Sequence, residues 1–97
     1  MIQHITLIYF KEDTRTEQQQ AVLAAFEKLP ELIPQVLRYR VGLDLALLEG
    51  NAGLAVLAEF ETEEDFLVYS SHPAHAEVIF PVCGAVMASY ATSQFEF

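Results

Sequence analysis

Five consecutive apolar residues, from Leu54 to Ala58, constrain the fold more than any other feature of the sequence. Side chains of a strand alternate between the two faces of a sheet, so an unbroken apolar run is typical of a strand that is buried on both faces. Residues 2–10 alternate between two sets that both contain apolar side chains. The sequence therefore predicts a sheet whose two faces are both covered.

The 97 residues form one predicted domain, 1–97, with the order strand, helix, strand, strand, helix, strand. The predicted strands span residues 2–10, 36–43, 54–60 and 90–97. A capping box of Thr16 and Gln19 predicts the start of the first helix, which runs to Leu29 with Val22 and Phe26 on its buried stripe. The second helical region begins at residues 62–69 and resumes at Pro73, and Pro81 interrupts it.

This order predicts a ferredoxin-like βαββαβ protomer of the α+β class, with a four-stranded antiparallel sheet and both helices on one face. The other face has no cover within the chain. A second copy of the chain can bury it, which predicts a homodimeric α+β barrel whose interior holds a core or a ligand. A charged residue at Val56 is expected to disturb this dimer, and the leucines of the 44–53 loop are expected to cover an opening.

The charge and cysteine content exclude several classes of partner. The net charge of −9 opposes binding to nucleic acid and to anionic membrane surfaces. No run approaches the roughly 20 apolar residues of a membrane span, and the amino terminus lacks a basic stretch with a cleavage site. A single cysteine, Cys83, cannot form an internal disulfide and has apolar neighbours, so we expect a packing residue. The predicted location is the cytoplasm.

The segment from Tyr69 to His75 carries the candidate chemistry. Pro73 predicts a helix start, and His75 then lies in the first turn, where the positive end of the helix dipole disfavours an imidazolium. A neutral His75 can accept a proton, and the Tyr69 hydroxyl can donate a hydrogen bond to a carbonyl. The alternative is that both residues only cap and pack around the helix start.

The remaining polar candidates have structural alternatives. His72 is expected to pack or to form a hydrogen bond at the helix start, and a metal site shared with His75 lacks an evident third ligand. His4 lies on a mostly apolar strand, where a lone histidine is more often a hydrogen-bonded core residue than a ligand. Arg38 and Arg40 share one strand face and are interpreted as solvated side chains.

Three parts of the sequence resemble the stress-responsive dimeric α/β-barrel (Dabb) family. They are Met1-Ile2-Gln3-His4-Ile5, the Glu59-Phe60-Glu61-Thr62-Glu63-Glu64 junction, and Tyr69 to His75 with its His-Pro-Ala-His core. The resemblance spans essentially the whole chain and implies a ferredoxin-like protomer in a homodimeric barrel. It does not imply a single activity, since the family includes plant stress proteins and a plant polyketide cyclase.

Several site residues follow from the resemblance to that cyclase. Its catalytic histidine and tyrosine match His75 and Tyr69, as general base and hydrogen-bond donor, and a histidine near its chain start matches His4. The candidate ligand-binding residues are His4, which this match supports, and His72, and no metal or cofactor is expected. A further histidine of the cyclase matches Leu54, so the polyketide substrate does not transfer to this chain.

Two functional hypotheses result. The first is a cofactor-independent cyclase, isomerase or lyase that binds a small, largely apolar molecule, with His75 and Tyr69 in catalysis. The second is a non-catalytic stress-responsive binding or protective protein. A cavity on which Tyr69, His75 and His4 converge favours the first hypothesis, and a filled interior favours the second.

Overall fold

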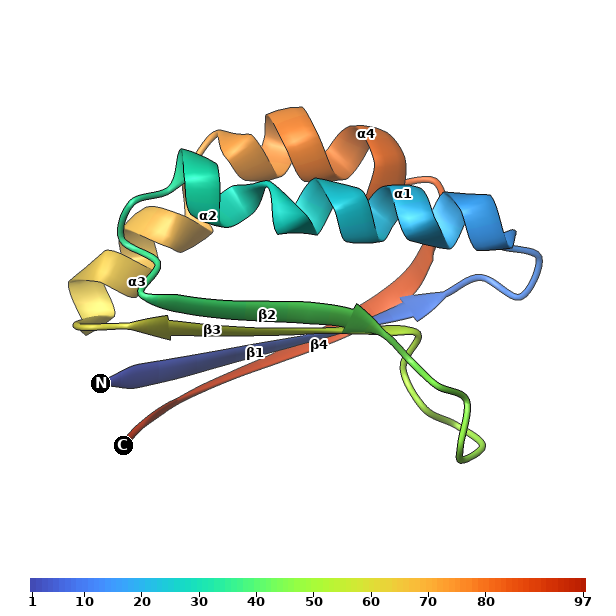
Figure 1. Cartoon of the computed structure of the whole chain (residues 1–97), viewed down its shortest axis with the longest axis horizontal. Coiled ribbons are helices and arrows are strands. Elements are labelled where there is room, and N and C mark those ends of the chain that lie inside the picture. The colour runs from blue at the N-terminus through green and yellow to red at the C-terminus, as the bar shows by residue number, and fades with distance from the viewer.

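The computed structural model describes residues 1–97 and contains one four-stranded antiparallel sheet. The strands are β1 (Ile2–Phe10), β2 (Arg38–Leu43), β3 (Leu54–Phe60) and β4 (Met87–Glu96). Their order in the sheet is β2-β3-β1-β4, so the first and third strands occupy the centre (Figure 1). This arrangement confirms the predicted ferredoxin-like α+β fold, and all helices cover one face of the sheet.

The helical layer consists of two successive regions. The first contains α1 (Thr16–Glu27) and α2 (Leu29–Leu32), and the second contains α3 (Glu63–Ser70), the π-helix η1 (His75–Ile79) and α4 (Phe80–Cys83). The backbone N–H of Arg15 donates to Gln18 Oε1 over 2.8 Å. The N-cap of α1 is therefore Arg15, one residue before Thr16, the predicted N-cap. No helix is both long and apolar enough to cross a membrane.

The core lies between the sheet and these helices. Val22, Phe26 and Leu29 are buried, as their helical spacing predicts, and they meet the helix-facing side chains of β3. Those side chains are Leu54, Val56, Ala58 and Phe60, each at most 1% exposed. Val56 therefore belongs to the core, and its predicted place in a dimer interface is wrong.

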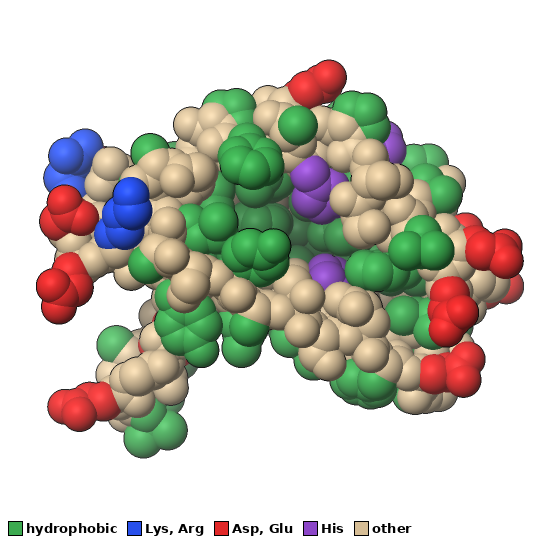
Figure 2. Space-filling view, turned by 180° about the vertical axis from the view of Figure 1, so that it is seen from behind, with side chains coloured by type: hydrophobic (Ala, Val, Ile, Leu, Met, Phe, Trp, Pro, Cys, Tyr) green, Lys and Arg blue, Asp and Glu red, His purple; other side chains and the backbone are tan.

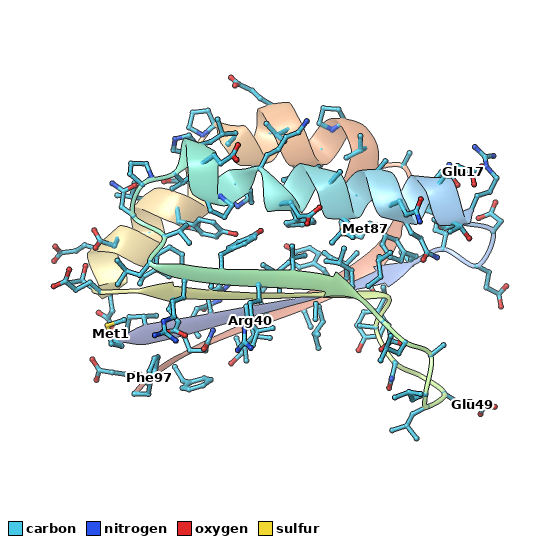
Figure 3. The ribbon with its side chains drawn as sticks, viewed as in Figure 1. Met1, Glu17, Arg40, Glu49, Met87 and Phe97 are labelled. Carbon is cyan, nitrogen blue, oxygen red and sulfur yellow. The ribbon has the colours of Figure 1, made fainter.

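The opposite side of the sheet, here called the open face, has no helical cover. Ile5, Leu7 and Leu57 lie on it in the two central strands and are only partly buried. Arg40 extends from β2 on the same side (Figure 3). Arg38, two residues earlier on the strand, shares this face, and both side chains are exposed, as predicted. β2 begins two residues later than the predicted strand of residues 36–43, and Leu37, which precedes it, is 53% exposed.

The loop between β2 and β3 extends below the open face (Figure 1). Its leucines, Leu45, Leu47 and Leu48, are between 74% and 79% exposed. Leu45 and Leu47 line a hollow of about 760 Å³ together with open-face residues such as Leu7 and Leu57. The opening that these leucines border is thus a hollow on the open face, and none of the three histidines lines it.

The second helical region departs from a regular α-helix. Residues His75–Ile79 form a π-helix, in which Phe80 N–H donates to the His75 carbonyl, and α4 follows with Pro81 in its first turn. Proline lacks the N–H of a regular helical bond, and its ring crowds the carbonyl four residues earlier. The interruption predicted at Pro81 is therefore a single turn of π-helix before α4. The final strand then begins at Met87, three residues earlier than predicted.

Candidate functional site

A cavity of about 400 Å³ lies between the sheet and the second helical region. Figure 2 shows it as a hollow with purple histidine side chains at its edge, and the histidines of its lining are His4 and His75. We call it the histidine cavity. The sheet contributes His4, Thr6, Ile8, Met87, Tyr90, Thr92 and Gln94, and the helices contribute Phe26, Phe66, Tyr69, Ser70, His75, Ile79, Phe80, Cys83 and Gly84. None of these side chains carries a formal charge at neutral pH, so the cavity suits an uncharged, largely apolar molecule.

The position of the cavity differs from the prediction. A site inside the dimeric barrel would lie on the open face, between two sheets. The structure instead places His4 and Tyr69 on the helix side, because His4 alternates with the open-face residues of β1 and Tyr69 ends α3 above the sheet. The cavity is thus formed by residues of one chain.

Tyr69 is held at the carboxyl end of α3. Thr62 Oγ1 accepts a hydrogen bond from Asp65 N–H over 3.1 Å and caps the helix start, as the sequence predicts. The Tyr69 side chain is 3% exposed and its ring lies 5.0 Å from that of Phe60. Burial raises the pKa of Tyr69 to about 12, so its hydroxyl remains a hydrogen-bond donor at neutral pH.

His75 meets Tyr69 edge to face at the first residue of η1. Their ring centroids are 4.7 Å apart with an interplanar angle of 90°. Burial lowers the pKa of His75 below 6.5, against the opposing effect of the His72 carbonyl, so the imidazole is neutral at pH 7. Its Nδ1 is buried without a hydrogen-bond partner, which leaves Nε2 as the ring nitrogen that can reach a bound molecule.

His4 borders the same cavity, but both of its ring nitrogens are occupied. Thr6 Oγ1 lies 2.9 Å from Nε2, and Gln94 Nε2 lies 2.9 Å from Nδ1. With the Gln94 amide donating to Nδ1, the proton of His4 lies on Nε2 and points to Thr6. His4 therefore contributes a fixed neutral ring to the cavity wall, and its nitrogens are not free to bind a ligand.

The pKa of His4 has a consequence for stability. Burial, aided by His75, lowers it from 6.5 to about 4. Between these pH values His4 is protonated in the unfolded chain and neutral in the native protein. The free energy of unfolding therefore decreases as the pH falls through this window. Urea unfolding at pH 7.5 and at pH 5 is expected to show this loss, and His4→Gln should make it smaller. An equal loss in the variant would contradict the assignment.

His72 lies outside the lining of the cavity. Its Nδ1 accepts a hydrogen bond from Ala74 N–H over 3.0 Å, which stabilises the start of the helical region after Pro73. This agrees with the local role expected at the helix start, and the geometry gives no support to ligand binding by His72.

Cys83 lines the cavity and is 3% exposed, and burial raises its pKa, as expected for a packing residue.

Sequence reasoning missed three polar residues of this region. Thr6 shares the face of His4 at a spacing of two residues, a signal that was present in the sequence. Gln94 is paired with His4 across β1 and β4, and only the strand register reveals that pairing. Tyr39 on β2 has a buried hydroxyl without a hydrogen-bond partner. Tyr69 raises the pKa of Tyr39, and Tyr39 lowers that of Tyr69.

The family model of the stress-responsive A/B barrel domain, Dabb, matches residues 2–96. The chain belongs to the Dabb family. A dimeric ferredoxin-like protein of unknown function from Thermobifida fusca is 32% identical, with a TM-score of 0.86 over 99% of this chain and 90% of that chain. A dimeric ferredoxin-like protein from Bacteroides fragilis is 25% identical, with a TM-score of 0.85 over 99% and 95% of the two chains.

Enzymes occur among more distant structures that share this Dabb protein's fold. The hydroxynitrile lyase of Passiflora edulis has a TM-score of 0.79 at 18% identity, covering 97% of this chain and 90% of that chain. This level of identity shows a common fold only. No curated protein matches the sequence.

Proposed function

We propose that this Dabb protein is a homodimer that binds a small, largely apolar carbonyl compound in the histidine cavity. His75 acts as the general base and Tyr69 as the hydrogen-bond donor in a cofactor-independent lyase, cyclase or isomerase reaction. The observation that carries the proposal is the contact between a neutral His75 and a protonated Tyr69 at the edge of an uncharged cavity. The similarity to the hydroxynitrile lyase shows a common fold only, so the proposal does not depend on it.

The proposed step is the removal of a proton from the carbon next to the carbonyl. We assign the ring proton of His75 to the buried Nδ1, so the other ring nitrogen, Nε2, accepts the substrate proton. The C–H electron pair moves toward the carbonyl oxygen, which accepts a hydrogen bond from Tyr69. The product of this step is an enolate beside an imidazolium, and the proton returns or moves on in the second half of the reaction.

Homodimer formation is supported by the uncovered apolar surface of the open face and by the dimeric state of the T. fusca and B. fragilis proteins. Burial of Ile5, Leu7 and Leu57 against a second copy removes this surface from water. Because the histidine cavity lies on the other side of the sheet, the dimer contributes to the stability of the site without forming its walls.

Deuterium uptake tests the chemistry without knowledge of the product. Small aromatic ketones, β-keto compounds and phenols are first screened for binding by NMR, and each bound ketone is then incubated with the protein in D₂O. Wild type is expected to exchange the protons next to the carbonyl faster than the buffer does. Binding without exchange would favour the second function, a non-catalytic binding protein.

The pH dependence of this exchange follows from the two pKa values. His75 is an active base only when neutral, and its pKa lies below 6.5, so kcat/KM should be constant near pH 8 and fall with an inflection below pH 6.5. Tyr69 stays protonated up to about pH 12 and adds no change in this range. A pH-rate profile with an inflection above pH 7 would contradict the assignment of His75 as base.

A further inference from the structure

Tyr39 is a polar residue of the site region that the proposed chemistry has not used. It lies on the helix-facing side of β2 and packs against the core. Its hydroxyl is buried and has no hydrogen-bond partner in the chain. A buried hydroxyl without a partner lowers the stability of a protein, so its presence requires an explanation.

The strand register places Tyr39 in the same row of the sheet as His4, which borders the histidine cavity. Tyr39 pairs with Ala58 on β3, Ala58 pairs with His4 on β1, and His4 pairs with Gln94 on β4. These residues form one row across the sheet, and neighbouring strands are about 4.8 Å apart. Ala58 has the smallest side chain of the four and is fully buried.

Tyr69 is the aromatic residue that lies over this part of the row. Its ring centroid is 5.7 Å from that of His4 and 5.0 Å from that of Phe60, which is two residues after Ala58 on the same face. The Tyr39 hydroxyl opposes the rise that burial causes in the Tyr69 pKa, although the two hydroxyls form no hydrogen bond in this structure. Burial, Tyr69 and Glu27 all raise the pKa of Tyr39, so Tyr39 remains a proton donor.

We propose that Tyr39 is a positioning residue that donates a hydrogen bond to the Tyr69 oxygen when Tyr69 donates its own proton to a bound carbonyl. This inference rests on the proposed function, because it assigns Tyr69 the same role. As the carbonyl becomes an enolate, negative charge extends onto the Tyr69 oxygen, and a second donor then strengthens the first hydrogen bond. The pair of tyrosines therefore favours ligands that carry or develop an oxyanion.

Two experiments with Tyr39→Phe test this role, with Tyr9→Phe on the open face as the matched control. In the first, 3-fluorotyrosine replaces tyrosine throughout, which lowers the pH range of ionisation, and ¹⁹F NMR follows the Tyr69 signal of the free protein. Tyr39→Phe should raise the ionisation midpoint of Tyr69, whereas Tyr9→Phe should leave it unchanged. An unchanged midpoint in Tyr39→Phe would overturn the proposal.

The second experiment measures the binding of 4-nitrophenolate, an oxyanion whose colour reports its ionisation. Loss of one hydrogen bond should weaken binding to Tyr39→Phe about two- to tenfold, with no effect of Tyr9→Phe. Thermal unfolding separates this role from a structural one, because removal of an unpartnered hydroxyl should not lower the melting temperature. Equal affinity of wild type and Tyr39→Phe would count against Tyr39 alone. Failure of wild type to bind the phenolate would count against the proposed function, and the ¹⁹F titration would still decide the role of Tyr39.

Discussion

His75→Ala is expected to lower the rate of deuterium uptake by a bound ketone by about 10²–10⁴-fold, the usual contribution of a general base. The ring is removed from a position beside Tyr69, while the cavity keeps its apolar walls. Ketone affinity should therefore change much less than the rate. NMR of the exchanging protons measures the rate, and a ligand titration measures the affinity.

His72→Ala is the matched control for this substitution. It removes a histidine only three residues away, whose Nδ1 bonds to Ala74 N–H and which does not line the cavity. The expected cost is about 0.5–1.5 kcal/mol of stability, from one lost hydrogen bond, with an exchange rate close to that of wild type. Equal losses of rate in both variants would mean that the helix start matters and the His75 base does not.

Leu57→Lys is expected to convert the homodimer into monomers. Leu57 lies on the open face between Ile5 and Arg40, so a lysine there puts a charge in the proposed interface and beside another cation. Each copy also loses about 1.5–3 kcal/mol of apolar burial, which predicts a dimer dissociation constant at least about 10²-fold higher. Sedimentation equilibrium measures this constant.

Leu67→Lys provides the comparison for the dimer experiment. Leu67 is 60% exposed on α3, on the helix side of the sheet, and the substitution makes the same change of chemistry there. We expect this variant to remain dimeric. A monomeric wild type, or dissociation of both variants to the same degree, would show that the open face is not the interface.

The sequence predicts the fold well because local patterns determine most of it. The local patterns are the apolar residues of β1 and β3, the helical spacing of Val22, Phe26 and Leu29, and the Thr62 cap. Each depends on residues close together in the chain. The errors occur where one residue of register decides the outcome. Val56 and Leu57 are adjacent in an unbroken apolar run, and only strand pairing shows which of them faces the helices.

The candidate site is less predictable for a related reason. Tyr69 and His75 are six residues apart, so their proximity follows from one helix end and one helix start. Gln94 and Tyr39 reach the same region through pairing with distant strands, and no local pattern indicates it. The position of the cavity on the helix side likewise depends on how α3 and η1 pack above the sheet.

A crystal structure with bound acetophenone tests the central claim most directly, because the histidine cavity and the hollow beneath the 44–53 loop lie on opposite sides of the sheet. The account predicts the ketone in the histidine cavity, with its carbonyl oxygen about 2.5–3.0 Å from the Tyr69 hydroxyl and its methyl carbon facing Nε2 of His75. A ketone bound instead in the hollow beneath the 44–53 loop would contradict it. So would a carbonyl in the histidine cavity that points away from Tyr69.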